Sequence, residues 1–185
     1  MAVANAASIR CNCRMTNAIT LPDSPSATPR SATSRSAALS SIWQLILGAE
    51  DVAGSPLVGL KIGNDLAYKI LRVGITSKAL EPVGEFLGLN KSLIASYLDL
   101  DRGTVNRLVA KDQLLPTHAA ENVLRFLELE AMAAETFATE AEASAWLSRP
   151  HPMLEDESPL AASQTSFGGQ RVKDILLAIK YGGAV

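Results

Sequence analysis

The sequence predicts an all-α fold, in which a helix-turn-helix domain precedes a small helical domain. Apolar residues recur at helical spacing in most segments, as in the i, i+3, i+4, i+7 series Val172, Ile175, Leu176 and Ile179. Polar capping residues and glycines mark where these segments begin and end. A strand is suggested only for residues 57–62. We therefore divide the chain into residues 1–36, 37–136 and 137–185.

Length and composition limit the range of functions. The chain has 185 residues, 48% of them hydrophobic, which is enough for one or two small domains. Its net charge of −2 and pI near 5.7 give no general attraction to nucleic acid. No apolar run approaches the roughly 18 residues of a membrane span, so we expect a soluble, cytoplasmic protein. Cys11 and Cys13 are expected to be free thiols.

Residues 1–36 are expected to form a disordered tail. They consist mainly of Ala, Ser, Thr, Pro and Asn, with four arginines and a single acidic residue, Asp23. Such a composition cannot build a core. An organelle transit peptide has a similar composition, and a start codon placed too far upstream is another interpretation.

Residues 37–136 contain the pattern of several helices. A short apolar helix is predicted for residues 37–48, one capped by Asn64 follows, and another begins at Thr76 or Ser77 and stops at Gly88. The longest helix begins at Pro116 and runs to about residue 135, linking the two halves of the chain. The residues expected to face inward are Leu66, Ile70, Leu71, Leu80, Val83, Phe86, Leu87, Ala120, Val123, Leu124, Leu127, Ala131 and Ala134.

Residues 90–111 have the spacing of a helix-turn-helix. Asn90 and Asp101 are the predicted caps of two short helices, joined by a turn at Asp99 and Leu100. Leu93, Ile94, Tyr97, Leu98, Val105 and Leu108 are expected to face inward. The pattern resembles the Xre-type DNA-binding fold, except that Asp99 stands where such turns usually have glycine. Aspartate tolerates the left-handed conformation.

The second helix of this unit carries candidate DNA contacts. Arginine suits guanine and asparagine suits adenine in the major groove, and hydroxyl or ammonium groups reach phosphate. The candidates are Lys91, Arg102, Thr104, Asn106, Arg107 and Lys111. This unit carries four basic and two acidic residues, a small positive excess for binding the DNA backbone. A unit that serves only for packing or dimerisation is therefore the alternative.

Residues 137–185 form the most consistent unit. Thr139 and Glu142 have the spacing of a capping box at the start of a short helix, which Pro150 and Pro152 end. The apolar series at 172–179 predicts a second helix, with Lys180 near its end and glycines at 182 and 183 to close it.

The order of these residues resembles the toxin-binding domain of Xre-type antitoxins, the partners of RES-domain toxins. The matching residues are Phe137, Ala143, Trp146, Leu147, Pro152, Leu154, Pro159, Leu160, Thr165, Gly168, Val172, Leu176, Ile179, Tyr181 and Gly182. By residue type, five of them favour a core position over a contact: Trp146, Leu147, Val172, Leu176 and Ile179.

The resemblance implies an antitoxin that binds an NAD-degrading RES toxin and covers its active site, and that dimerises and represses its own operon. The candidate toxin contacts are Trp146, Leu154, Arg171, Lys180, Tyr181, Gly182 and Gly183. Two alternatives remain. One is a transcriptional regulator whose last domain dimerises or binds another protein, and the other is an adaptor with a degenerate helix-turn-helix.

Enzyme chemistry is not indicated. His118 and His151 are the only histidines and lack metal-ligand spacing, and Gly168-Gly169 lacks the Lys-Ser/Thr of a phosphate loop. We therefore expect no catalytic residue, metal or cofactor. Nine acidic residues lie between Glu121 and Ser158, which indicates either a solvated face or a surface for a basic partner.

Overall fold

A computed structural model describes residues 32–47 and 62–183, with side chains from residue 37 onward. These residues form an all-α fold, as predicted, and their only bridge between extended segments is an isolated antiparallel one between Thr76 and Leu114. None of the described helices is both long and apolar enough to cross a bilayer.

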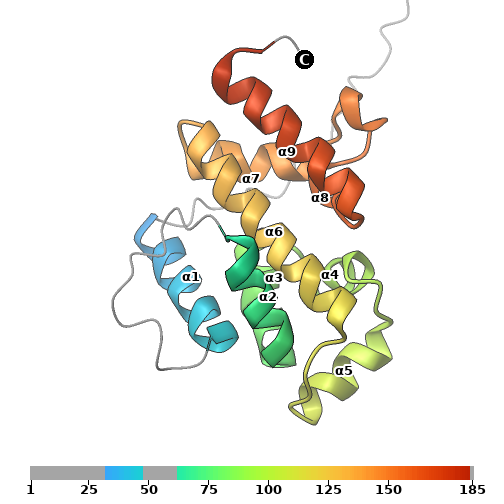
Figure 1. The fold of residues 1–185 in the computed structure, drawn as a ribbon. Coiled ribbons are helices and arrows are strands. Elements are labelled where there is room, and N and C mark those ends of the chain that lie inside the picture. The colour runs from blue at the N-terminus through green and yellow to red at the C-terminus, as the bar shows by residue number, and fades with distance from the viewer. Residues whose placement is uncertain (1–31, 48–61, 184–185) are drawn as a thin grey trace, which may run out of the picture.

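The described helices follow one another with short connections, apart from the segment between α1 and α2 (Figure 1). In chain order they are α1 (Ala32–Leu47), α2 (Asn64–Val73), the 3₁₀ helix η1 (Ser77–Ala79), α3 (Leu80–Leu87), α4 (Lys91–Tyr97), α5 (Arg102–Ala110), α6 (Thr117–Thr136), α7 (Glu140–Ser148), the 3₁₀ helix η2 (Pro152–Leu154), α8 (Pro159–Ala162) and α9 (Ser166–Tyr181).

Most helix starts agree with the sequence prediction because a local side chain satisfies the free N–H groups of the first turn. The Asn90 and Asp101 side chains accept hydrogen bonds from backbone N–H groups of α4 and α5. Thr139 and Glu142 form the predicted capping box of α7. The prediction at Asn64 was wrong, because Gly63 occupies the cap of α2 and no side chain bonds there.

The N-terminal region differs from the prediction in one respect. Helix α1 begins at Ala32, so residues 32–36 are helical although they were assigned to the tail. Residues 1–31, which include Cys11 and Cys13, and residues 57–61 of the suggested strand lie outside the described residues.

Helix α6 is the central element of the fold, with α2 against its first half and α7 and α9 against its second (Figure 1). Because neighbours surround it, α6 is buried on more than the one predicted face, and Phe126 and Leu129 are fully enclosed, whereas Ala134 is exposed. The buried side chains form one continuous cluster from Ile42 to Leu176. Residues 37–136 and 137–185 therefore contribute to one core, and α6 packs against helices of both parts.

Candidate functional site

Helix α9 is the last described element, and both of its ends are fixed locally. The Thr165 hydroxyl accepts a hydrogen bond from the Gly168 N–H at the first turn. At the other end Gly182 adopts the left-handed conformation, with a φ of 68°, and the Gly183 N–H bonds to the Ala178 carbonyl. Glycine favours this geometry because it has no Cβ. Gly182 and Gly183 thus fold back onto α9, as the closing role predicted for them requires.

Two ion pairs hold α9 beside α6. Lys173 Nζ lies 2.8 Å from Glu128 Oε2, and Lys180 Nζ lies 2.9 Å from Glu135 Oε2. Both pairs join residues 45 positions apart, so the two helices run parallel and in register. The Glu135 carboxylate raises the pKa of Lys180 above its ordinary value, chiefly through their hydrogen bond. The Lys180 ammonium is therefore already paired, although it was a candidate contact residue.

The outer side of α9 is unusually apolar for an exposed surface. Every large hydrophobic residue that is exposed between residues 115 and 183 belongs to this helix. The residues, with their exposed fractions, are Phe167 (89%), Leu177 (42%), Ile179 (37%) and Tyr181 (76%). Apolar side chains gathered on one exposed helix mark an interaction site more often than scattered ones do.

Ile179 was predicted to face inward, and the structure shows this to be wrong. The register of the two helices places it level with Ala134 of α6, which is exposed as well. The C-terminal ends of α6 and α9 therefore extend past the buried cluster, so Ile179 is exposed to solvent although it continues the buried stripe. The remaining members of the stripe, Val172, Ile175 and Leu176, are buried as expected.

The other predicted toxin contacts occupy different environments. The Trp146 ring is half-buried, with its centroid 5.6 Å from the ring of Phe137 and 5.7 Å from that of His151. Leu154 is buried in the core. Arg171 is exposed on α9, where its Nη1 atom lies 3.9 Å from Glu155 Oε1.

Several of the nine acidic residues between Glu121 and Ser158 make contacts within the fold. Glu128 and Glu135 pair with lysines of α9, and Glu142 belongs to the capping box. Glu130 is buried and accepts a hydrogen bond from the Ser144 hydroxyl. Exposed acidic residues remain at the η2 loop, where Glu155 and Asp156 both have left-handed backbone conformations, with φ of 58° and 62°.

Arg125 joins α6 to the turn between α8 and α9. Its Nη1 group donates hydrogen bonds to Asn122 Oδ1 at 2.6 Å and to the carbonyls of Ser163 at 3.1 Å and Gln164 at 3.2 Å. Burial lowers the pKa of Arg125 from its ordinary value. The Asn122 amide in turn donates to the Tyr97 carbonyl at the end of α4. These bonds connect the end of α4, through α6, to the start of α9.

Helices α4 and α5 form where the sequence predicted two short helices, and the turn at Asp99 and Leu100 joins them. Asp99 takes the left-handed conformation, with a φ of 54°, at the position where glycine is usual. The Asp101 carboxylate accepts bonds from the Thr104 hydroxyl and backbone N–H, and these bonds lower the pKa of Asp101. Leu93 was predicted to face inward but is 38% exposed, so only Ile94 and Leu98 of that face are buried.

The candidate DNA contacts divide into two groups. Arg102, Asn106, Arg107 and Lys111 are exposed on or just after α5. Thr104 is half-buried, with its hydroxyl on Asp101, and Lys91 pairs with Glu81 at 2.9 Å, which raises the pKa of Lys91. Exposed arginine and asparagine side chains are the groups that read base edges in the major groove.

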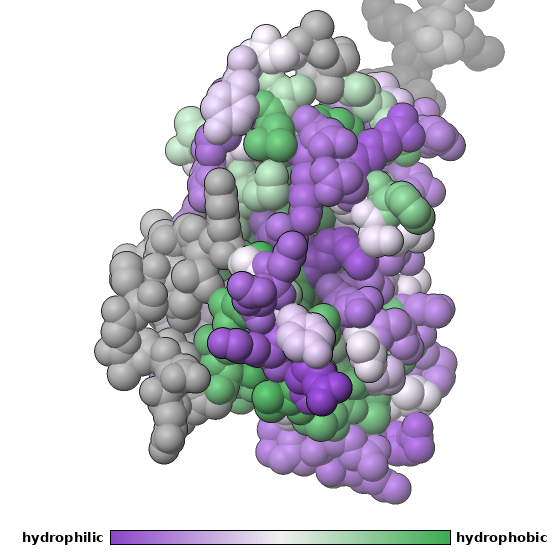
Figure 2. Space-filling model, viewed as in Figure 1, coloured by the Kyte–Doolittle hydropathy of each residue, from purple (hydrophilic) through white to green (hydrophobic). Residues whose placement is uncertain are grey.

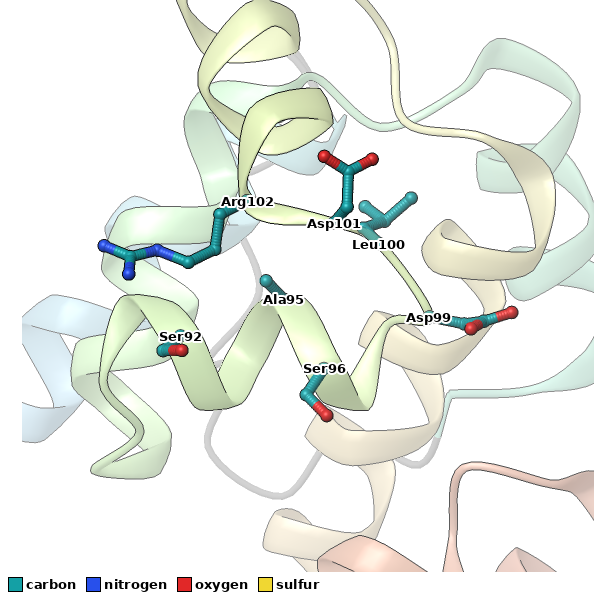
Figure 3. Close-up of a pocket in the computed structure, with 7 residues that line it drawn as sticks. All are labelled: Ser92, Ala95, Ser96, Asp99, Leu100, Asp101 and Arg102. Atoms are coloured by element: carbon teal, nitrogen blue, oxygen red, sulfur yellow. The ribbon is translucent and has the colours of Figure 1, made fainter.

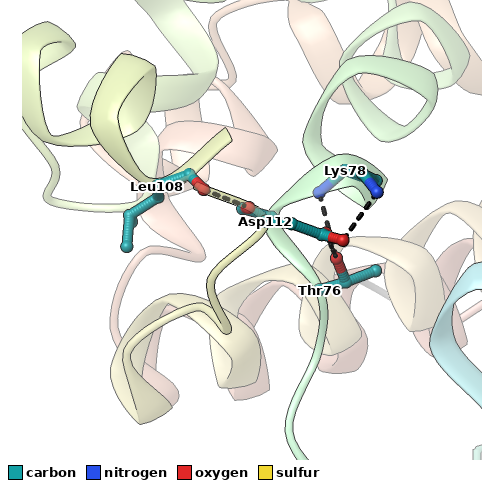
Figure 4. A network of polar contacts seen from close by, with 5 residues as sticks. Thr76, Lys78, Leu108 and Asp112 are labelled. Carbon is teal, nitrogen blue, oxygen red and sulfur yellow. Dashed lines mark hydrogen bonds and ion pairs between the residues drawn. The ribbon is translucent and has the colours of Figure 1, made fainter. Parts of the chain in front are cut away.

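A polar network joins the C-terminal end of α5 to η1. The Asp112 carboxylate accepts bonds from Lys78 Nζ at 2.6 Å and from the Thr76 hydroxyl at 3.1 Å (Figure 4). The buried Ser77 hydroxyl donates to the Leu108 carbonyl at 2.9 Å. These bonds fix the orientation of α5 relative to η1.

A hollow lies between the two helices of the motif, with a volume of 410 Å³. Figure 3 shows Ser92, Ala95 and Ser96 of α4 on one side of it, with Arg102 and the turn residues on the other. Both serines are exposed. They were missed in the sequence, although two serines four residues apart on the first helix were a usable signal. Within the described ranges, no group of three His, Cys, Asp or Glu side chains is placed to hold a metal ion.

Comparison with protein families gives one match. Residues 132–182 match the antitoxin Xre/MbcA/ParS C-terminal toxin-binding domain. The matched segment contains the end of α6, α7, α8 and all of α9. No curated protein matches the chain. The C-terminal part is thus similar to a domain through which antitoxins bind toxins, which supports an antitoxin function.

Proposed function

We propose that this protein is the antitoxin of a RES–Xre module. Its C-terminal domain binds a RES-domain toxin that degrades NAD and blocks the active site of that toxin. Its helix-turn-helix binds operator DNA as a homodimer and represses the operon in the cytoplasm. The observation that carries the first part is that the exposed large hydrophobics of the segment matching a toxin-binding domain all lie on α9.

The end of α9 suits insertion into a cleft. Tyr181 is 76% exposed and presents an apolar ring with a polar tip, and Leu177 is exposed one turn before it. Gly182 and Gly183 close the helix without adding side-chain bulk. A toxin that consumes NAD must admit a bulky substrate, so a protein segment at the entrance inhibits by exclusion and needs no chemistry of its own.

Tyr181→Ala tests this contact without removing the helix cap. We expect the variant to bind the RES-domain protein encoded beside this chain more weakly by about 2 kcal/mol, because an aromatic anchor is lost from the interface. NAD consumption should return in cells that produce both proteins. The melting temperature should not change, since the side chain is mostly exposed.

Tyr68→Ala is the matched control, because Tyr68 is 65% exposed on α2, outside the matched segment. This variant should neutralise the toxin as well as the wild type. If Tyr181→Ala still suppresses NAD consumption at equal stoichiometry, the end of α9 does not block the toxin, and the exposed acidic residues of the η2 loop become the better candidate. Absence of a RES-domain protein in the adjacent reading frame would contradict the proposal as a whole.

Four exposed polar residues on or just after α5 support operator binding. Arg102, Asn106 and Arg107 can meet base edges, and Lys111 can meet phosphate. Ser92 and Ser96, across the hollow from Arg102, add two hydroxyl groups suited to phosphate oxygens. The pairing of Lys91 with Glu81 reduces the contribution expected from that residue.

Arg107→Ala should weaken operator binding by about 1–3 kcal/mol and leave toxin neutralisation intact, because Arg107 is exposed and far in sequence from the matched segment. Affinity of the wild type should fall with salt at a log–log slope of about −4 to −6, as for a dimer with four to six phosphate contacts. Electrophoretic mobility shifts and fluorescence anisotropy measure both quantities.

Arg149→Ala is the control, since Arg149 is an exposed arginine of the C-terminal part. It should not change operator affinity. If the wild type, with or without toxin, fails to shift its own promoter fragment at about 50 mM salt, where phosphate contacts are strong, the repressor function is wrong.

A second function is favoured by the same helix-turn-helix geometry. In that case the chain is a transcriptional regulator, and the apolar face of α9 joins two copies of it. Light scattering distinguishes the two functions, because Tyr181→Ala would then convert a dimer to a monomer rather than release a toxin.

A further inference from the structure

The outer face of α9 has two apolar ends and a polar middle. Phe167 lies in the first turn, and Leu177 and Tyr181 lie in the last two. With a rise of about 1.5 Å per residue, Phe167 and Tyr181 are roughly 21 Å apart along the helix. Between them, Gln170 donates a hydrogen bond to Asp174 at 2.9 Å, and Arg171 lies near Glu155.

Phe167 is the most exposed large hydrophobic side chain in the described part of the chain, at 89%. No role in folding explains it, because the residues that hold the first turn of α9 are its neighbours Thr165, Gly168 and Gly169. A Cβ on Gly168 would lie 1.9 Å from the Ala162 carbonyl oxygen, and one on Gly169 would lie 2.6 Å from Arg125 Cδ. The backbone beside Phe167 is therefore pressed against α8 and α6.

This close packing gives Phe167 a rigid base. The helix start cannot turn Phe167 inward, because the glycine side of α9 must remain against Ala162 and Arg125. An aromatic ring that is exposed on a fixed backbone loses little conformational freedom when it is covered by another protein. Such side chains are typical anchors of protein interfaces.

A stable interface must also cover more of α9 than the two turns that end at Tyr181. A standard interface covers about 800 Å² on each partner, which for a round patch is roughly 30 Å across. A patch of that size over the last turns of α9 extends along the helix for a distance similar to that between Tyr181 and Phe167. The only other large exposed hydrophobics at residues 115–183 are Leu177 and Ile179, at the Tyr181 end.

We propose that Phe167 is a second anchor for the toxin, which lies along the whole outer face of α9. This inference rests on the proposed function. The toxin surface would have two apolar recesses, roughly 21 Å apart, that receive Phe167 and Tyr181. Polar groups between the recesses would face Gln170, Arg171 and Asp174. The toxin is the partner because this face is continuous with the Tyr181 end and belongs to the segment that matches a toxin-binding domain.

The test measures the affinity of the full-length protein for the RES-domain protein encoded beside it, by calorimetry. Phe167→Ala should weaken binding about 30-fold, as expected for an anchor residue, with no change in melting temperature. Phe167→Leu should recover most of the affinity, because it restores an apolar side chain. Combined with Tyr181→Ala, the two effects should multiply, since the sites are far enough apart to act independently.

Val73→Ala is the control, because Val73 is 75% exposed on α2, outside the matched segment. If the wild type does not bind the RES-domain protein, the proposed function fails. If the wild type binds, Tyr181→Ala weakens binding and Phe167→Ala does not, the toxin lies only over the end of α9 and this inference is overturned. The same conclusion follows if Phe167→Ala leaves toxin affinity unchanged but separates a dimer into monomers, because the face would then be covered by a second copy.

Discussion

Gly168→Ala is expected to destabilise the protein by about 3 kcal/mol, the upper part of the usual range for overpacking. An added Cβ would lie 1.9 Å from the carbonyl oxygen of Ala162 and 2.8 Å from its carbonyl carbon. Both atoms belong to the backbone of α8, so no side chain can rotate away to relieve the contact. Helix α8 or the start of α9 must shift.

Thermal or urea unfolding measures this effect, and a loss of about 3 kcal/mol corresponds to a melting temperature lower by about 6–12 °C in a chain of this size. Gly63→Ala is the control, because a Cβ there would meet nothing within 4 Å. The control should cost less than about 1 kcal/mol, the modest difference between glycine and alanine at a helix cap. Equal stability of the two variants would show that α8 and α9 are not packed this closely.

Arg125→Met is expected to cost about 3 kcal/mol, because methionine keeps the aliphatic bulk but removes the donor of three hydrogen bonds. Asn122 and the carbonyls of Ser163 and Gln164 would lose that donor. A hydrogen bond to a charged group contributes about 1.5–3 kcal/mol, and the expected total stays near the top of that range because the three acceptors share one Nη1 group with two hydrogens.

Arg125→Lys should be intermediate in chemical denaturation, since a lysine retains the charge but not the planar guanidinium group. Arg149→Met is the matched control, because Arg149 is exposed after α7. That control should change the free energy of unfolding by less than about 0.5 kcal/mol. A similarly small effect of Arg125→Met would contradict the role of Arg125 in joining α6 to the α8–α9 turn.

Most helices and many of their boundaries followed from local patterns, although α8 was not predicted and α1 begins earlier than expected. Asn90, Asp101 and Thr139 cap helices in the structure because each satisfies N–H groups two or three residues away, a relation visible in the sequence. Asp99 and Gly182 take the left-handed conformations that their residue types permit. The all-α fold class and the pair of helices α4 and α5 depend on such local relations.

Long-range contacts explain why the environments of several residues on α9 differ from those predicted. Lys180 looked available to a partner, but its ammonium group pairs with Glu135, 45 residues away. Ile179 continues the spacing of the buried stripe, yet the paired ends of α6 and α9 leave it at the edge of the core. In the sequence, Gly169 was noted only as part of a failed phosphate loop and Gly168 also as a position of the family pattern. Their close contacts with Ala162 and Arg125 define their role.

The sequence by itself determined most of the helices, the caps at Asn90, Asp101 and Thr139, the turn at Asp99 and the segment at which to look for toxin binding. It could do so because helical periodicity, capping and residue chemistry act within a few positions of the chain. The tertiary structure decided that the two halves form one buried cluster around α6, that Leu154 is core, and that Phe167 and Tyr181 remain exposed on one helix. Those outcomes depend on which faces α6 and α9 bury against each other, a relation between segments 45 residues apart that no local pattern contains.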